Sequence, residues 1–458
     1  MDSKKVLNIA LDKNVTFSLN IFKNSVLSYY LKEKKTCLST MITQEILPYP
    51  VVQYNNLFPN SIDAFLELFE GILDLESIEH GMSLDFVIDA KIDNQKVNPM
   101  LRLATPHDAR AITEICSEVY KGTYPYFDLM DEQAVRNMIR SPDHHFILFL
   151  VEKQIVGCFR CALNRSQKRG YMGGFMLKSP YHGIIDVVKT IIGSYVWMWS
   201  TFKDEILIWY CENRTAHAAS QYITAVCGIH TIAIFPNKDI FFHEIESDVM
   251  GITYQEKALS EMRSKENPQL IEDAIDSFLY ADGLYNLGSF RIENSEMELD
   301  MDKVEKLREK IKISISEDVH KYQHVSFSLA GSNAFFNFLH TPHIQNCEKV
   351  EYEVYNCEEF FVFLEYFNQY MKEHEIRYSE IFISAYNPQF QKIINTFGFH
   401  ARGFVPCWKY HQQDKYFEDH IIFNWYQGEL SNLDLLPEGV QLLEMISLNN
   451  SKEKSLYS

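Results

Sequence analysis

Residues His217 to Pro236 (HAASQYITAVCGIHTIAIFP) decide the fold, because the chain repeats their pattern 170 positions later, from Asn387 to Pro406 (NPQFQKIINTFGFHARGFVP). The two stretches align without a gap, and the residues between the matches keep the same apolar pattern. They agree at five positions, which are Gln221/Gln391, Ile223/Ile393, Gly228/Gly398, His230/His400 and Pro236/Pro406. The matches include a glycine and a proline, residue types at which helices and strands end or bend, and this favours a duplicated supersecondary unit.

Each copy predicts the same local structure. A short β-rich run, Ile206–Tyr210 or Ile381–Ser384, precedes a polar turn and a helix of about ten residues. The helix is expected to end at Gly228 or Gly398, because a left-handed residue after a helix is least costly as glycine. An alternating apolar run then predicts a strand, so the module is strand, helix, glycine, strand, proline.

Length and composition limit the possible classes of protein. The 458 residues predict two or three domains, and 46% hydrophobic with 14% aromatic residues suffices for packed cores. A net charge of −19 argues against a large nucleic-acid-binding surface, which would have to be basic. The acidic balance suits a cationic amine substrate, or it serves solubility alone.

The cysteines and the apolar runs indicate the compartment. The nine cysteines lie mostly inside apolar runs, which predicts reduced thiols in a cytoplasmic protein. Cys158 and Cys161 have the spacing of a metal or redox pair, but in a strand they point to opposite faces, so we expect no metal. The N-terminus lacks the apolar core of a signal peptide. No apolar run reaches the length of about 18 residues that a membrane span requires, so no membrane association is expected.

The remaining elements follow from periodicity. Residues 1–98 predict an N-terminal extension or small accessory domain, with helical patterns at 16–30 and 61–75. From residue 101 we expect a strand, and then a helix that begins after Thr105-Pro106 and ends near Tyr120. A hairpin about Lys153 follows, with a bulge at Gly157. Another strand and an apolar helix at 184–200 complete the segment before the first copy. Between the copies the pattern predicts helices at 267–285, 302–313 and 358–374, and strands at 325–329 and 349–355.

This order of elements resembles the GNAT fold, the family of acyl-CoA-dependent N-acyltransferases. Arg102-Leu-Ala-Thr-Pro-His-Asp-Ala resembles the opening strand and helix of that family, and Leu177–Gly183 resembles its fourth strand and cofactor loop. His217–Ile229 and Asn387–Phe399 resemble its late helix, which ends in Gly-Phe. The resemblance covers about residues 99–260 and, with more divergence, 340–428.

The resemblance implies an α/β (α+β) protein with two GNAT-like domains, each a mixed and mostly antiparallel sheet flanked by helices. The expected boundaries are 1–98 for the extension, 99–268 for the first GNAT-like domain, 269–430 for the diverged second one and 431–458 for a C-terminal tail. In this tail we expect a loop, a short apolar turn at 440–446 and a disordered end.

The resemblance also implies acetyl-CoA or another acyl-CoA as donor and no metal. The family holds the pyrophosphate of CoA on backbone N–H groups at a helix N-terminus. The matching groups are those of Phe175, Met176, Leu177, His182, Gly183, Ile184 and Ile185. The chain departs from the pattern, because Ile185 and Val187 replace two glycines and Asp186 places a negative charge there.

The catalytic residues are predicted in the first copy. The tyrosine that serves as general acid in the family is replaced by Thr224 and by Ile394. Glu212 or His217 could take the proton of the ammonium group, and Tyr254 could protonate the leaving thiolate. Glu246 or Asp248 could hold a cationic substrate.

Structural alternatives remain open for these and neighbouring residues. Glu212 and His217 could act only at the helix N-terminus, beside a cap supplied by Asn213 or Thr215. Lys238-Asp239 could be a turn. The paired glutamines and histidines of the repeat, at 221, 391, 230 and 400, are expected to be structural.

Three classes of function follow from this sequence. The first is an N-acyltransferase that moves an acyl group, typically acetyl, from acyl-CoA to the amine of a small or amino-acid-like molecule. The second is a tandem GNAT-like transferase that uses another donor such as aminoacyl-tRNA. The third is a catalytically silent ligand-binding protein with the same fold.

Overall fold

The computed structural model describes residues 49–89 and 96–447. These described residues belong to one compact unit. The helix expected at 16–30 and the disordered end expected at 448–458 lie outside the described residues.

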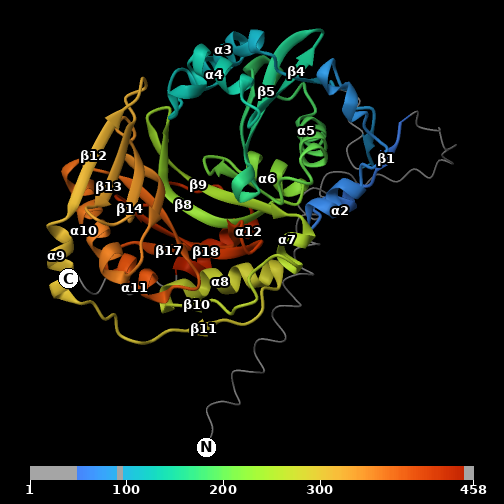
Figure 1. Ribbon diagram of the computed structural model, residues 1–458. Helices are drawn as coiled ribbons and strands as arrows, with labels where there is room; N and C mark the ends of the chain where they lie inside the picture. The colour runs from blue at the N-terminus through green and yellow to red at the C-terminus, as the bar shows by residue number, and fades with distance from the viewer. Residues whose placement is uncertain (1–48, 90–95, 448–458) are drawn as a thin grey trace, which may run out of the picture. The chain divides into compact units, whose positions relative to one another are not determined.

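A single mixed sheet of 14 strands runs through this unit, in the order β12-β13-β14-β15-β16-β18-β17-β8-β9-β7-β6-β5-β4-β3 (Figure 1). The parallel pairs in it are β6 with β7 and β15 with β16. The mixed and mostly antiparallel character of the sheet is therefore confirmed, but one continuous sheet is present where a separate sheet was expected for each of two domains.

The first half follows the predicted order of elements, with the addition of helix α4 (Glu132–Arg140), which was not predicted. It comprises β3 (Met100–Leu103), α3 (Ala109–Tyr120), α4 (Glu132–Arg140), β4 (His144–Val151), β5 (Gln154–Asn164), β6 (Arg169–Leu177), α5 (Val187–Thr201), β7 (Ile208–Arg214), α6 (Ala219–Val226), β8 (His230–Phe241) and β9 (Glu244–Tyr254). The bulge expected at Gly157 is present, since the pairing of β4 with β5 shifts between Phe149 and Leu150. Helix α5 begins three residues later than predicted, because the side chain of Asp186 caps it by accepting from the Lys189 N–H.

The second half of the sheet repeats the same order of pairing. It comprises α8 (Glu272–Tyr285), α9 (Met301–Arg308), β12 (Ile311–Glu317), β13 (Gln323–Leu329), β14 (Phe335–Thr341), β15 (Asn346–Glu353), α10 (Cys357–Glu373), β16 (Tyr378–Ser384), α11 (Pro388–Thr396), β17 (His400–His411) and β18 (Tyr416–Tyr426). The halves differ after their first strand. Helices α3 and α4 separate β3 from β4, whereas β12 joins β13 through a short turn at 318–322.

The repeated module is formed as predicted. Helices α6 and α11 are followed by Gly228 and Gly398, both left-handed, with φ of 80° and 82°. The shared prolines lie in matching irregularities, because the register shifts between Phe235 and Asp239 in β8 and between Val405 and Lys409 in β17. The residue after each proline is again left-handed, Asn237 with φ 55° and Cys407 with φ 57°. We call residues 236–238 and 406–408 the two bulges.

The paired glutamines and histidines of the repeat have equivalent structural roles. The Gln221 amide donates to Asp434 O and accepts from Leu436 N, and the Gln391 amide donates to Gln269 O and accepts from Ile271 N. In the same way, His230 lies 2.9 Å from Glu438 and His400 lies 3.4 Å from Asp273.

The C-terminal segment differs from the prediction for 431–458. Pro437–Ser447 forms a helix, α12, in place of the expected short apolar turn. Leu442 and Ile446 are buried against Ile234 of β8 and Val249 of β9, and burial of this apolar face stabilises the helix. Helix α12 thus packs on the first half of the sheet, at the place that α8 takes on the second half.

Residues 49–88 also pack on the first half of the sheet, against α5 and α6. This segment contains β1 (Val51–Val52), α2 (Ile62–Glu67) and β2 (Val87–Ile88). Phe65 contacts Trp199 of α5 with 5.0 Å between ring centroids, and Phe58 N–H donates to Val226 O. The segment therefore shares a core with α5 and α6.

The two halves meet where β17 pairs with β8 through Gly403 and Ala233. A Cβ atom at Gly403 would lie 2.2 Å from the Ala233 Cβ and 2.8 Å from Ile232 O. Since backbone cannot yield easily at this distance, only glycine permits this close approach.

We predict that Gly403→Ala lowers the free energy of unfolding by about 1 to 3 kcal/mol, because it forces the central strands apart. Gly283→Ala is the matched control. Gly283 lies in α8 with open space around its Cβ position, so alanine should stabilise the helix by about 0.5 to 1 kcal/mol. Denaturant unfolding measures both, and equal effects of the two variants would contradict the account.

Candidate active site

The candidate site lies where two parallel strands separate. Strands β6 and β7 pair from Arg169–Ile208 to Met172–Cys211, and their pairing ends there. A cavity of about 520 Å³ occupies the gap beyond this point. Residues of β6, β7, α5 and α6 line it together with the loop after α3, so it opens at the C-terminal ends of the parallel strands, as ligand sites in such sheets do.

One wall of the cavity is the backbone of β6. Gly173, Gly174 and Phe175 line it, and the register of β5 with β6 shifts at this point. Gly174 is left-handed with φ 61°. Because β7 has already turned away, the N–H groups on that side of β6 are directed to the cavity rather than to a neighbouring strand. Such groups can stabilise a carbonyl oxygen that gains negative charge.

The other end of the cavity is acidic. Glu212 of β7, Asp239 of β8 and Asp248 of β9 line it. Asp239 and Asp248 share a side-chain hydrogen bond, so one of the two carries a proton. Among the described residues Asp248 Oδ1 has no hydrogen-bond partner although it is buried, and the same holds for the hydroxyl of Ser220 on the cavity wall. Buried acceptors without partners are expected where a ligand supplies the donor.

Burial holds these carboxyl groups partly protonated. It raises the pKa of Glu212 to about 7, with Lys238 lowering it and Glu380 and Asp248 raising it further. Burial raises the pKa of Asp248 to about 6 and raises that of Asp239 well above its usual range, next to the charge of Asp248. A carboxyl group with a pKa near 7 is suited to act as a general base at neutral pH.

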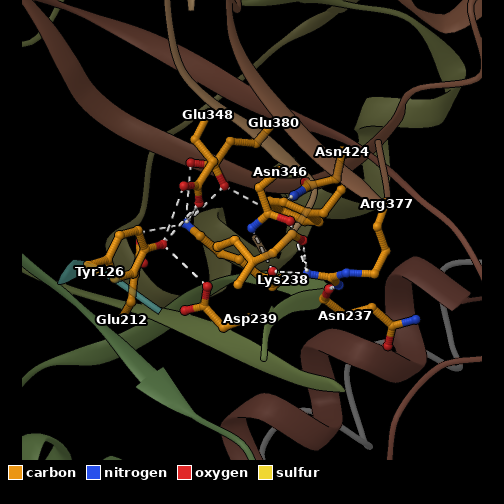
Figure 2. Close-up of polar contacts among 12 residues, drawn as sticks. Tyr126, Glu212, Asn237, Lys238, Asp239, Asn346, Glu348, Arg377, Glu380 and Asn424 are labelled. Atoms are coloured by element: carbon orange, nitrogen blue, oxygen red, sulfur yellow. Dashed lines mark hydrogen bonds and ion pairs between the residues drawn. The ribbon is translucent and has the colours of Figure 1, made fainter. Parts of the chain in front are cut away.

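Lys238 lies behind Glu212 at the junction of the two halves (Figure 2). Its Nζ is 3.1 Å from Glu212, 3.2 Å from Glu380 and 3.6 Å from Glu348, and the side chain is 3% exposed. Burial opposes the charge of Lys238, but the surrounding glutamates outweigh this effect and raise its pKa. Lys238 and Asp239 are thus buried residues of β8 and do not form the turn that the sequence left open.

The loop expected to hold the pyrophosphate of CoA fits that group poorly. The N–H groups of Ile184 and Ile185 donate to Tyr181 O, and the N–H of Asp186 donates to Val97 O. The Asp186 carboxylate caps α5 in the position that an anion would take. Of the loop, His182, Gly183 and Val187 line the cavity. The residues present therefore suit the thioester end of a donor better than a diphosphate.

The predicted site residues divide into two groups. Glu212, His217, Asp248, Phe175, Leu177, His182 and Gly183 are brought together around the cavity. Ile184 is exposed on the surface, while the side chains of Met176 and Ile185 are buried in the core, so these three lie outside the cavity. The helix caps expected from Asn213 or Thr215 are not formed, since α6 begins after Ala218 without a side-chain cap.

Two further predicted site residues, Tyr254 and Glu246, are not among the residues that line the cavity. The Tyr254 side chain is buried in the core at the far end of β9, and its hydroxyl donates to Pro406 O. It cannot reach a thiolate in the cavity. The Glu246 carboxylate forms two hydrogen bonds with Arg214, at 2.6 and 2.8 Å, so it is not free to hold a cationic substrate.

Sequence reasoning missed the tyrosines of the cavity. Tyr120, Tyr124, Tyr126 and Tyr171 line it, and burial raises the pKa of each hydroxyl, so all four remain protonated at neutral pH. The signal was the run Tyr-Lys-Gly-Thr-Tyr-Pro-Tyr at 120–126, which places three hydroxyls on a turn directly after a helix.

The second half carries different residues at the equivalent positions. The register pairs Phe235 with Asp248 and Val405 with His420, and it pairs Asp239 with Glu246 and Lys409 with Glu418. The residues that correspond to Glu212, Lys238, Asp239 and Asp248 are accordingly Phe382, Trp408, Lys409 and His420. Phe382 and Trp408 stack at 4.6 Å, and the Arg169 guanidinium lies 3.8 Å above the Trp408 ring. The acidic site therefore belongs to the first half.

Within residues 49–89 and 96–447, no group of three or more His, Cys, Asp or Glu side chains is arranged to hold a metal ion. In the same part of the chain, no helix combines the length and hydropathy of a membrane span.

Comparisons with known proteins give structural matches alone. No family model matches the chain, and no curated protein matches it in sequence. Solved structures that match the chain include acetyltransferases.

Three of these matches illustrate the range. RimL, a ribosomal L7/L12 α-N-protein acetyltransferase in complex with coenzyme A, is 10% identical, with 35% of this chain and 96% of that chain covered and a TM-score of 0.29. A ribosomal-protein-S5-alanine acetyltransferase from Vibrio fischeri is 13% identical over 34% and 93%, with a TM-score of 0.30. A variant of the spermidine N-acetyltransferase SpeG from Vibrio cholerae is 12% identical over 36% and 96%, also with a TM-score of 0.30. Scores this low do not assign an activity.

The raised pKa of Glu212 predicts how stability depends on pH. The folded chain binds this proton more tightly than the unfolded chain, whose ordinary value is 4.5. The resulting stabilisation is complete below pH 4.5, declines up to about pH 7 and is lost above it. In Glu212→Gln the melting temperature should therefore fall less between pH 4.5 and 8 than in the wild type.

The decrease of melting temperature with pH should become smaller in Glu212→Gln but should not disappear. The reason is that the raised pKa values of Asp239 and Asp248 also lower stability as the pH rises. Differential scanning fluorimetry across this range measures it. Parallel curves for wild type and variant would show that Glu212 does not hold its proton in the folded state.

Proposed function

We propose that this protein is a GNAT-type N-acyltransferase, built from two GNAT-like units that arose by duplication. The first unit transfers an acyl group from an acyl thioester such as acetyl-CoA to the amine of a small cationic acceptor. The second unit supports the first and carries no acidic site of its own.

A single observation carries this proposal. One cavity joins the unpaired backbone of β6 to the carboxyl groups of Glu212, Asp239 and Asp248. The backbone side suits a polarised thioester carbonyl, and the acidic side suits an ammonium group. A cavity with these two ends places an acyl donor beside an amine, which is the arrangement that acyl transfer requires.

The chemistry then follows from the residues present. The Glu212 carboxylate takes a proton from the bound ammonium, and Asp248 holds the positive charge beside it. The neutral nitrogen attacks the thioester carbon, whose oxygen is stabilised by N–H groups of β6. The carbon–sulfur bond breaks, and the thiolate takes a proton from one of the cavity tyrosines, whose hydroxyls stay protonated at neutral pH. The nitrogen, which is positively charged after the attack, loses its second proton to that tyrosine as the amide forms, and Glu212 releases its own proton to solvent.

Two alternatives remain as outcomes of the tests below. An aminoacyl-tRNA donor fits the poor diphosphate loop, but the net charge of −19 opposes a nucleic-acid partner. A silent binding protein would bind an amine or a thioester without releasing thiol.

Kinetics of amine acylation test the proposal. Thiol release from acetyl-CoA over a panel of cationic amines should identify an acceptor. Glu212→Gln should lower kcat by about 10²- to 10⁴-fold, because it removes the general base. Asp248→Asn should raise the KM of the amine by about 10- to 100-fold, because it removes a charged partner.

Tyr254→Phe is the matched control. It loses one buried hydroxyl outside the cavity and should leave kcat unchanged. Wild-type turnover in Glu212→Gln, or a loss of turnover in Tyr254→Phe, would refute the assignment of roles. Binding without thiol release across the panel would favour the silent protein.

The occupied loop predicts that the nucleotide part of the donor contributes little. S-acetylpantetheine, which lacks the diphosphate and adenosine, should retain kcat/KM within about tenfold of acetyl-CoA, a difference of no more than about 1.4 kcal/mol. A loss of kcat/KM of about 10³-fold or more would show that the diphosphate is bound after all, and that the loop rearranges to hold it.

A further inference from the structure

We propose that Lys238 is a positioning residue for Glu212, and that the second half of the sheet holds Lys238 in place and so takes part in the chemistry of the first. The inference rests on the proposed function, since it concerns the base of that same site. It gives the second half a role although Phe382 and Trp408 replace the acidic site there.

The backbone of the bulge that carries Lys238 is clamped by residues of the second half (Figure 2). The Arg377 guanidinium donates to Asn237 O, to Lys238 O at 2.7 Å and to Ile344 O at 3.1 Å. The Asn346 amide donates to Lys238 O at 2.7 Å. Arg377 directly precedes β16 and Asn346 begins β15, so the parallel pair of the second half fixes the course of β8.

The residue before Lys238 is held from the same side. The Asn237 amide donates to Gln427 O and Glu429 O, and its oxygen accepts from Ser431 N–H. Residues 427–431 follow the last strand of the second half. Hydrogen bonds to this many fixed partners leave the bulge little freedom to move.

The ammonium group of Lys238 connects both halves. Glu380 on β16 and Glu348 on β15 hold it from the second half, and the Glu380 carboxylate itself accepts from the Tyr378 hydroxyl at 2.6 Å. On the other side Lys238 contacts Glu212, the member of the cluster that lines the cavity. The three glutamates thus share one cation. The charges of Glu348 and Glu380 in the second half therefore determine how strongly Lys238 stabilises the ionised carboxylate of Glu212.

The titratable groups that face Glu212 come from every neighbouring element. They are Lys238 and Asp239 on β8, Asp248 on β9, Glu348 on β15, Glu380 on β16, Tyr171 on β6, Tyr210 and Cys211 beside it on β7, and Tyr126 on the loop after α3. Lys238 is the one cation among them that contacts Glu212. The carboxyl groups oppose its ionisation, and the tyrosines and the thiol are neutral at physiological pH.

This arrangement predicts opposite effects for two variants that leave the cavity lining intact. Lys238→Met removes the cation and should shift the titration of Glu212 upward by about 1 to 2 pH units. Glu380→Gln removes a competing anion, keeps an acceptor for Tyr378 and should shift the titration downward by about 1 pH unit. The acidic limb of kcat/KM should move in the same directions, because Glu212 must be ionised to act.

Carbon-13 NMR of the full-length chain labelled at the glutamate carboxyl carbon measures the titration directly. The Glu212 resonance is identified by its loss in Glu212→Gln. Glu351→Gln is the matched control, because Glu351 is an exposed carboxylate on β15, the strand of Glu348, and should not move the titration.

The outcomes separate this inference from the proposed function. Opposite shifts support the coupling, and their presence without any acyl transfer would overturn the proposed function alone. Equal titration in wild type, Lys238→Met and Glu380→Gln would overturn the positioning role even in an active enzyme. If Lys238→Met does not fold, the downward shift in Glu380→Gln decides the matter, and its absence contradicts the inference.

Discussion

The contact between the Lys238 ammonium and the glutamates at 212, 348 and 380 is the interaction on which the rest of the structure depends. A buried cation among carboxylates is stable only when geometry and hydrogen bonds offset its desolvation. The clamp of Arg377 and Asn346 on the bulge provides that geometry. It also connects the one place where the two halves of the sheet join to the acidic end of the cavity.

Each half contacts the other through a side chain of its bulge, but the two contacts differ in kind. In the first half the bulge sends Lys238 into the carboxylates of β15 and β16, and in the second half the bulge sends Trp408 against Tyr210 and Arg169 of the first. The same backbone device therefore yields an ionic contact on one side and an aromatic contact on the other. This inequality is what the proposed duplication would produce if one unit retained the site and the other supported it.

Local patterns in the sequence predicted much of the fold. Gly228, Gly398 and the prolines at 236 and 406 mark backbone turns whose cause lies in the residue itself, so they could be read without a structure. The cavity followed in part, since Glu212 and Asp248 were expected in the segments that adjoin strands of the first copy, where a sheet presents functional groups. The contacts of Lys238 with the second half could not be predicted, because Glu348 and Glu380 are more than 100 positions away. Tyr254 was expected at the site because strand periodicity does not say which end of a strand faces a ligand. The helix at 437–447 was missed because it depends on burial against β8.

A crystal structure with a non-reactive thioether analogue of acetyl-CoA tests the central claim most directly, namely that one cavity receives both the donor and the amine. The account predicts that the carbonyl of the analogue lies between β6 and β7, with its oxygen on N–H groups near Gly174 and its acyl carbon facing Glu212. An analogue bound elsewhere, with the gap between β6 and β7 empty, would contradict the account.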